Sequence, residues 1–389
     1  MPPKKRKLLV VASALDLRLP FGCTPAWWFL LKALWAEGCE LKVAAYAGDS
    51  VESPWWRTLP NPARGAAGLF RAARGWLPAG LRRGEGALAK RLVASGVAPR
   101  WKRLLEAELE REPGTSAVLY LSAPPAHLAP VAASLGARFS VPQVYYDGDA
   151  PVTLPSMRAV FKGGVRQFEG PELGLFDLVV SNSLGAGAEY LALGAKRVST
   201  VWWGADPDFH RPPPRGAAQD LDLLFCGFGE EFRRDWMEAM LYRPARENPA
   251  WRVGLCGGGF RPGPGARLVD AGPLGLAGFP ATAARSKIQA CVTRDTHARV
   301  AASANARLFE LACMGLCLVS NPVEGLARWF EEGSELLVLR RPEQAVPAYR
   351  RLLKSEKLRR EMGRRARARV LDEHTTAHRA RKLLREMGL

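Results

Sequence analysis

Residues 210–226 read HRPPPRGAAQDLDLLFC, a proline-rich segment that runs directly into an apolar stretch. Three consecutive prolines favour a stiff, extended chain, which is typical of a linker between domains. The apolar stretch 221–226 predicts a buried strand, and a similar stretch occurs near the start of the chain at 7–13. A strand pattern that begins twice, on either side of a linker, predicts two domains.

Strand-like runs alternate with helical stretches in both halves of the chain. Further strands are expected at 41–46, 117–122, 141–146, 177–181, 197–201, 251–256, 287–292, 316–319 and 335–339. Helices are expected at 25–38, in pieces over 60–111, and at 126–135, 232–242, 306–313, 325–331 and from 342 onward. Because this alternation implies right-handed crossovers, we predict an α/β fold with parallel sheets. The expected domains are 1–209 and 220–370, joined by a linker at 210–219 and followed by a basic helix at 371–389.

Length and composition favour a globular protein. A chain of 389 residues exceeds what one hydrophobic core usually supports. Hydrophobic residues make up 48% and charged residues 24%, which excludes long disordered tracts. No apolar run approaches the roughly 20 residues that cross a bilayer, and no signal peptide is recognisable. The seven cysteines include no C-x-x-C pair, so we expect reduced thiols, a cytoplasmic protein and no metal site.

The net charge of +18 is the unusual feature of the composition. Arginines gather in the segments 64–111 and 340–385, and such a surface attracts anions. Nucleic acid, anionic lipid and phosphate-bearing substrates all qualify, and a solvated arginine-rich surface is the alternative. No RNA- or DNA-binding motif is recognisable, and MPPKKRK resembles a nuclear localisation patch but leads directly into a predicted strand.

Three glycine-containing segments follow predicted strands: 15–24 with Gly22, 226–229 with Gly227, and 257–259. In open α/β sheets ligands bind outside the carboxyl ends of the strands, and glycine lets the backbone approach a phosphate closely. None matches G-x-G-x-x-G or a P-loop, so neither a dinucleotide-binding fold nor a P-loop enzyme is predicted. Each segment is therefore either a ligand-binding loop or a tight turn.

The segment 293–324, TRDTHARVAASANARLFELACMGLCLVSNPVE, concentrates polar groups on an apolar background. Arg294 and Arg307 offer planar forks that pair with phosphate, and Asn305 lies between them. Glu310 can accept two hydrogen bonds from a vicinal diol, such as that of a ribose. Arg307 and Glu310 are three residues apart and share one helix face, so a surface ion pair is the alternative. Their apolar neighbours favour a site.

Three stretches resemble GT-B glycosyltransferases, in particular the CgeB-like group named for spore maturation proteins. The first is ARLFELACMGLCLVSNPVEGLARWFEEGSELLVLRRPEQ (306–344), with a related tail ARARVLDEHTTAHRARKLL at 366–384. The second is SNSLGAGAEYLALGAKRVSTVWWGADPDFHRP (181–212), and the third is VYYDGDAPVTLPSMR (144–158). The resemblance covers most of the chain after Ala117, and the first hundred residues match only in outline.

Two motifs carry the resemblance. One is R-[LI]-F-E, which stands here at 307–310. The other is G-x-D-x-x-x-F-x-P, which Gly204, Asp206 and Pro212 match. His210 occupies the aromatic position of the second motif, beside Phe209.

The resemblance implies two Rossmann-like domains with parallel sheets facing a central cleft. It also implies sugar transfer from a nucleoside-diphosphate sugar, with no cofactor and no metal. Relatives of the large retaining family contact the donor with two glutamates separated by seven residues; Glu310 falls at the second position, but Ala302 stands at the first. By the same resemblance, Glu310 would bind the ribose, while Arg294, Arg307 and the Gly227 loop would hold the diphosphate.

Asp147-Gly148-Asp149 has the D-x-D shape that binds a metal with a sugar nucleotide in the other main glycosyltransferase fold. Here it ends a strand of the N-terminal half, so we predict acceptor-side roles instead, with Asp147 as the base and Asp149 beside it. The acceptor would pass the Gly22 loop. None of the five histidines lies in a recognisable hydrolase context, and His297 either touches phosphate or lies on the surface.

The acceptor is unknown, and the basic surface suggests an anionic or lipid-linked molecule and a protein held at the face of an anionic membrane. Three other readings stay open. A GT-B protein that binds sugar nucleotides without turnover would explain Ala302. A nucleic-acid-binding protein would explain the charge alone. The two-domain outline also fits periplasmic-type binding proteins and some epimerases.

Overall fold

The computed structural model describes residues 6–17, 24–65, 93–157, 168, 171–214, 216–229 and 232–389. Contacts group the chain into two compact units. The N-terminal unit comprises Met1–Val201 with Ala380–Leu389, and the C-terminal unit comprises Trp202–Arg379. The division by contacts thus falls at Val201 and Arg379, whereas the prolines suggested a linker at 210–219.

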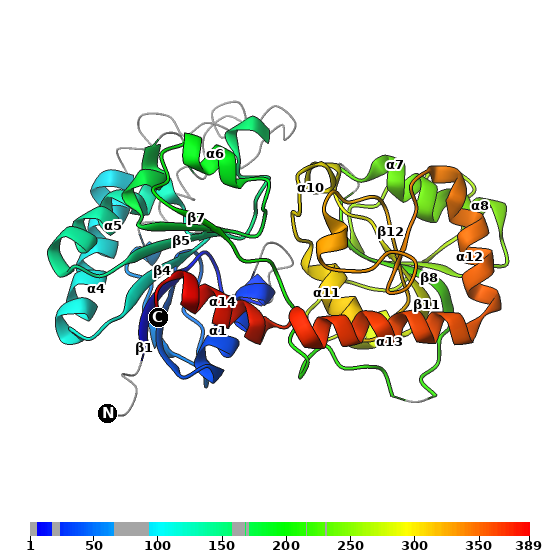
Figure 1. Ribbon diagram of the computed structural model, residues 1–389, viewed down its shortest axis with the longest axis horizontal. Coiled ribbons are helices and arrows are strands. Elements are labelled where there is room, and N and C mark those ends of the chain that lie inside the picture. Colours follow the sequence, from blue (N-terminus) through cyan, green and yellow to red (C-terminus); the bar gives the residue numbers. More distant parts are fainter. Residues whose placement is uncertain are drawn as a thin grey trace. The chain divides into compact units, whose positions relative to one another are not determined.

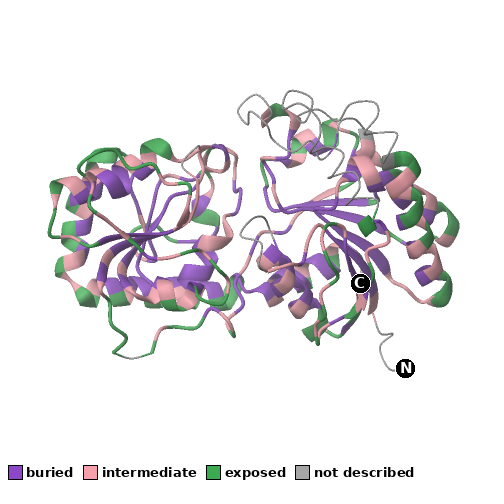
Figure 2. Ribbon diagram, turned by 180° about the vertical axis from the view of Figure 1, so that it is seen from behind, coloured by how far each residue is buried: buried purple, intermediate pink, exposed green. Residues whose placement is uncertain are grey.

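The N-terminal unit is built on a parallel sheet in the order β3-β2-β1-β4-β5-β6-β7. The strands are β1 (Arg6–Ala12), β2 (Cys39–Ala45), β3 (Arg57–Leu59), β4 (Ala117–Leu121), β5 (Gln143–Asp147), β6 (Leu178–Ser181) and β7 (Val198–Thr200). The central strands are apolar and buried along nearly their whole length, as strands covered by helices on both faces must be (Figure 2).

Helices cover both faces of this sheet (Figure 1). They are α1 (Thr24–Ala36), α4 (Ala98–Arg111), α5 (Pro125–Phe139), α6 (Gly187–Ala192) and the end of α14 (Thr376–Glu386). α4 and α5 pack together, and their apolar faces join one buried core with β4 and β5. The end of α14 is held by an ion pair of 2.7 Å between Arg381 Nη1 and Glu37 Oε1. Arg197 Nη2 also donates to the carbonyl oxygen of Glu386 over 2.7 Å.

The C-terminal unit repeats this topology with a parallel sheet in the order β10-β9-β8-β11-β12-β13. Its strands are β8 (Leu221–Phe228), β9 (Val253–Gly258), β10 (Leu268–Asp270), β11 (Ser286–Cys291), β12 (Leu318–Ser320) and β13 (Leu337–Val338). In both sheets the first strand lies in the middle and the order then reverses, which is the Rossmann arrangement. The predicted α/β fold of two Rossmann-like domains is confirmed.

The helices of this unit begin with α7 (Arg234–Met237), which continues through a π turn (Glu238–Tyr242) into α8 (Arg243–Glu247). The others are α9 (Phe279–Ala284), α10 (Asp295–Arg299), α11 (Ala306–Cys313), α12 (Ala345–Lys354), α13 (Glu356–Glu373) and the start of α14. α11 packs along α13, and α12 packs against β11 (Figure 1). None of the helices in the described part of the chain is long and apolar enough to span a membrane.

The structure differs from the expected elements at a few places. β3, β10, α9 and α10 are short, and β10 is only partly buried, so none has the long apolar run that predicts an element. The helix expected at 325–331 is a single 3₁₀ turn, Leu326–Arg328. Of the helical segment expected at 60–111, the part at 66–92 lies outside the described residues, and α4 occupies the end of it.

Candidate donor-binding site

The C-terminal sheet reverses its order between β8 and β11, where ligands of open α/β sheets bind. Arg233 bridges the carboxyl ends of these two strands. Its Nε donates to the carbonyl oxygen of Val292 over 2.8 Å, and its Nη1 donates to those of Phe228 and Gly229. The guanidinium also lies 5.9 Å from the centroid of the Phe225 ring. Arg233 is therefore fixed in place by main-chain groups from both strands, without a carboxylate.

Three arginines act on one another at this edge of the sheet. Burial lowers the pKa of Arg233 to about 9, and the positive charges of Arg294 and Arg307 lower it further while Asp295 opposes them. Arg294 precedes α10 and forms no ion pair with any described residue. Neighbouring cations repel one another and attract an anion, and arginine pairs with phosphate in a planar, bidentate manner.

Helix α11 supplies the opposite charge. Asn305 caps it, because its Oδ1 accepts a hydrogen bond of 3.1 Å from the backbone N–H of Arg307. Arg307 Nη1 lies 2.7 Å from Glu310 Oε2, and the Arg307 guanidinium stacks 4.1 Å from the centroid of the Phe279 ring. The Glu310 side chain is 10% exposed. The expected ion pair is therefore partly buried and held on an aromatic ring.

The glycine at 227 plays a different local role from the one expected. β8 continues to Phe228, so Gly227 lies inside the strand and the loop begins at Gly229. Gly227 faces Gly257 of β9, and a Cβ on Gly257 would lie 2.0 Å from the Gly227 carbonyl oxygen. The two glycines thus allow β8 and β9 to approach closely at the edge where the arginines gather. Contact of Gly227 with a diphosphate stays a prediction.

Ala302, at the position of the missing glutamate, is completely buried with a φ of 47°. Its N–H donates to the carbonyl oxygen of Glu324 over 2.8 Å, and its own carbonyl accepts from Trp202 Nε1 over 3.0 Å. Its Cβ would lie 3.0 Å from a Cβ placed on Gly325. Ala302 is therefore an enclosed position whose main chain is held on both sides by hydrogen bonds.

On the acceptor side, Asp147 lies at the buried end of β5. Its carboxylate is fully buried, and Oδ2 accepts from Thr153 Oγ1 over 2.5 Å and from Tyr190 O–H over 2.8 Å. Oδ1 accepts from the Asp149 N–H over 2.9 Å, and burial raises the pKa of Asp147 to about 6. The group organises the turn after β5. Gly22 lies outside the described residues, and its role and those of Asp147 and Asp149 stay predictions.

His297, on α10, is half-buried rather than on the surface. Burial lowers its pKa to about 3, with Arg294 and Arg233 as further causes, so the ring is neutral beside the arginines. Among the described residues no group of three or more His, Cys, Asp or Glu side chains could hold a metal ion.

Arg233 is the residue that the sequence did not reveal. It follows β8 by five residues, and its partner Val292 lies 59 residues further along the chain. The signal that could have found it is a basic residue just beyond the first strand of the second half, at the expected reversal of the sheet.

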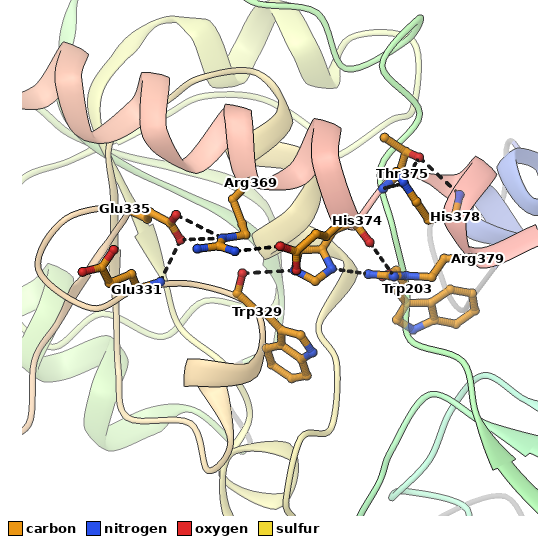
Figure 3. A network of polar contacts seen from close by, with 10 residues as sticks. Trp203, Trp329, Glu331, Glu335, Arg369, His374, Thr375, His378 and Arg379 are labelled. Carbon is orange, nitrogen blue, oxygen red and sulfur yellow. Dashed lines mark hydrogen bonds and ion pairs between the residues drawn. The ribbon is translucent and has the colours of Figure 1, made fainter. Parts of the chain in front are cut away.

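The remaining residues of the resembling motifs connect the beginning of the C-terminal unit, at 203–206, with its end, at 373–379 (Figure 3). His374 Nε2 lies 3.1 Å from the carbonyl oxygen of Trp329, and Arg379 donates to His374 Nδ1, Glu373 O and Trp203 O. The backbone of 204–206 pairs with that of 374–376, and a Cβ on Gly204 would lie 2.7 Å from the His374 carbonyl oxygen. The motif glycine and the E-H-T tail thus form one structural network.

Comparison with known folds agrees with this architecture. Sucrose-phosphate synthase from Thermosynechococcus elongatus has a similar structure, with a TM-score of 0.66 and 14% identity over 98% of this chain and 99% of that one. The chain has the GT-B fold. Anabaena HepE in complex with UDP and glucose has a TM-score of 0.60 and 14% identity over 98% of this chain and 99% of that one. The glucosyltransferase of phage T4 in complex with UDP-glucose has a TM-score of 0.57 and 9% identity over 98% of this chain and 100% of that one.

The sequence comparison covers a smaller part of the chain than the structural one. Residues 233–385 match the family described as glycosyl transferase-like, and this stretch includes Arg233, Arg294, Arg307 and Glu310. No curated protein sequence matches the chain.

Proposed function

We propose that this GT-B protein is a glycosyltransferase that moves a sugar from a nucleoside-diphosphate sugar to an acceptor. The observation that carries the proposal is the convergence of Arg233, Arg294 and Arg307 at the reversal of the C-terminal sheet, with Glu310 beside them. Three cations suit the diphosphate, and a carboxylate one helical turn from Arg307 suits the ribose diol. The match of 233–385 to the glycosyl transferase-like family supports the same reading.

In this proposal the arginines do the chemical work. When the bond between sugar and diphosphate breaks, negative charge develops on the leaving diphosphate, and fixed guanidinium groups stabilise it. Arg233 is preorganised by three main-chain carbonyl oxygens, so it needs little rearrangement as charge develops. Transfer would then proceed without a metal. UDP is the first nucleotide to test, since two of the similar structures hold UDP or UDP-glucose.

The finer assignments belong to the same proposal. Membership of the CgeB-like group, a hexose as the transferred sugar, and a role in the cell envelope rest on the motifs at 144–158, 181–212 and 306–344. An anionic or lipid-linked acceptor and peripheral contact with an anionic membrane rest on the net charge of +18. Cosedimentation with phosphatidylglycerol vesicles at low salt tests the membrane contact, and protein that stays in the supernatant excludes it.

A second candidate function is favoured by Ala302, which stands where relatives carry a donor-contacting glutamate. A protein that binds the donor without transferring the sugar would keep Arg307 and Glu310 but not that carboxylate. Donor binding without product over a broad acceptor panel would support this alternative, and any sugar transfer would exclude it.

The donor site is tested by thermal unfolding with UDP, GDP, ADP and UDP-glucose. A ligand that binds only the folded state at a hundred times its dissociation constant adds about 2.7 kcal/mol of stability, and the midpoint rises accordingly. The double variant Arg307→Ala, Glu310→Ala should lose this rise. The matched control is Arg360→Ala, Glu356→Ala, which removes an exposed ion pair of α13 and should keep it. No rise with any nucleotide, or an equal rise in both double variants, would overturn the assignment.

A further inference from the structure

His210 lies against Glu310 inside the C-terminal unit. Its Nε2 is 4.0 Å from Glu310 Oε1, and the other carboxylate oxygen, Oε2, is bound by Arg307. The His210 ring is fully buried between Phe209, at a centroid distance of 5.0 Å, and Phe279, at 6.2 Å. The same Phe279 ring carries the Arg307 guanidinium. His210 is therefore built into the wall of the candidate donor site.

The contacts of the ring define which nitrogen carries the proton. His210 Nδ1 lies 3.2 Å from the backbone carbonyl oxygen of Asp206, which can only accept. Nδ1 is therefore the donor, and in the neutral ring Nε2 is an acceptor. Nε2 then faces Glu310 Oε1, which also only accepts, and this explains a separation longer than a hydrogen bond. A second proton on the ring would turn Nε2 into a charged donor aimed at the carboxylate.

The ring is neutral at neutral pH. Burial is the largest influence and lowers the pKa of His210 below 6.5, and Arg307 lowers it further. Glu310 and Asp206 raise it without reversing the direction. Glu310, Arg307 and Asp206 are among the charged groups that act on His210.

We propose that His210 is a positioning residue that controls access of the donor's ribose to Glu310, so that proton uptake at Nε2 and donor binding exclude each other. With a neutral ring, Glu310 Oε1 is open to a ribose hydroxyl while Arg307 holds Oε2. With a protonated ring, Nε2 donates to Oε1, and both oxygens are occupied. The inference rests on the proposed function, because it takes Glu310 as the ribose ligand.

The residue type at position 210 makes this control specific to the present chain. His210 stands at the motif position where the resembling glycosyltransferases carry an aromatic residue. Phenylalanine there would enclose Glu310 equally well but could not titrate. The variant His210→Phe therefore removes the proton and keeps the packing, and His210→Gln places an amide that donates at every pH near the position of Nε2.

The test is the affinity for UDP-glucose, measured by calorimetry between pH 5 and pH 8 on the natural chain and both variants. The diphosphate of UDP-glucose is doubly esterified and gains no proton in this range. The natural chain should bind most tightly at high pH and lose up to about tenfold per pH unit below the pKa of His210, the limit for competition by one proton. His210→Phe should bind equally tightly at every pH, and His210→Gln weakly at every pH. A slope that persists in His210→Phe overturns the proposal.

A measurement without ligand separates this inference from the proposed function. In NMR spectra of histidine-labelled protein, Nδ1 of His210 should be the protonated nitrogen, and Glu310→Gln should lower the pKa of His210 because it removes the attracting charge. An unchanged pKa overturns the contact itself. If the natural chain fails to bind UDP-glucose at pH 8, the proposed donor site and the control of ribose access fall together, and the NMR titration shows whether the His210–Glu310 contact survives them.

Discussion

Arg307 and Glu310 form an ion pair of 2.7 Å on one face of α11, with the Arg307 guanidinium stacked on the Phe279 ring. An exposed pair of this kind contributes little to stability, so its value as a structural device would be small. Here both groups are partly buried and lie beside two further arginines. The pair thus presents a cation and an anion one helical turn apart, which matches the diphosphate and the ribose of a nucleotide.

The first prediction is that Arg294 and Arg233 both contribute to nucleotide binding but only Arg233 contributes to stability. Arg294→Met should weaken binding of UDP or UDP-glucose and leave stability almost unchanged, because Arg294 forms no ion pair with a described residue. Arg233→Met should weaken binding and also destabilise the fold, since the carbonyl oxygens of Phe228, Gly229 and Val292 lose their donor. Val292 is buried, and leaving a buried carbonyl group unsatisfied costs about 1–3 kcal/mol.

Urea unfolding and calorimetric titration measure the two effects on the same samples. Arg299→Met serves as the control, because Arg299 is exposed on the same short helix, α10. Equal losses of affinity in Arg294→Met and Arg299→Met would show that net charge, rather than the cluster, attracts the nucleotide.

The second prediction concerns Gly204. A Cβ there would lie 2.7 Å from the His374 carbonyl oxygen and 2.9 Å from the carbonyl group of Thr375, all backbone atoms that cannot move aside easily. Gly204→Ala should therefore destabilise the C-terminal unit by about 1–3 kcal/mol, the usual cost of overpacking. Gly275→Ala is the control, because a Cβ at Gly275 meets nothing within 4 Å. The urea midpoint measures both, and equal midpoints would contradict the close backbone pairing of 204–206 with 374–376.

The third prediction is a pH dependence of stability that comes from Asp147. Burial raises its pKa to about 6, against about 3.9 in an unfolded chain. The folded state therefore holds the proton more tightly, and stability falls as pH rises between about 4 and about 6. The shift corresponds to about 3 kcal/mol.

Asp147→Asn removes this contribution, so the difference in unfolding free energy between natural chain and variant should change over that pH window and stay constant above it. Urea unfolding at pH 4, 5, 6 and 7 measures it. A constant difference throughout would mean that Asp147 is not buried as a neutral acid. Sugar transfer that survives in Asp147→Asn would also exclude Asp147 as the acceptor-side base.

The fold could be predicted because buried parallel strands are short apolar runs, as β1 and β8 are. The Arg307–Glu310 pair could also be predicted, since residues three apart share a helix face whatever the rest of the chain does. Both are local properties of the sequence. The same local pattern predicts a loop at Gly227, because it does not show where a strand ends in a sheet, and it misses β10, which is only 3 residues long.

Contacts between distant segments could not be predicted in this way. Arg233 bonds to Val292 only because β8 lies next to β11 in the sheet. His210 reaches Glu310, one hundred residues later, only because the segment after β7 returns to the start of α11. The place of Asp147 after β5 predicts an acceptor-side role, whereas its hydrogen bonds to Thr153 and Tyr190 are evident only in three dimensions.

The fourth prediction asks whether the missing glutamate can be restored. Ala302 is fully buried with a φ of 47°, and Gly325 packs against it. Ala302→Glu would place a carboxylate at a completely buried position, so we expect a loss of more than about 3 kcal/mol of stability and no gain in transfer. Ala302→Gly should be close to neutral, because glycine adopts a positive φ without strain but loses a buried methyl group and adds freedom to the unfolded chain. Thermal unfolding measures the stability of both variants, and a transfer assay with UDP-glucose measures their activity. A stable Ala302→Glu variant with raised activity would show that this position faces the donor, and the second candidate function would then gain its strongest support.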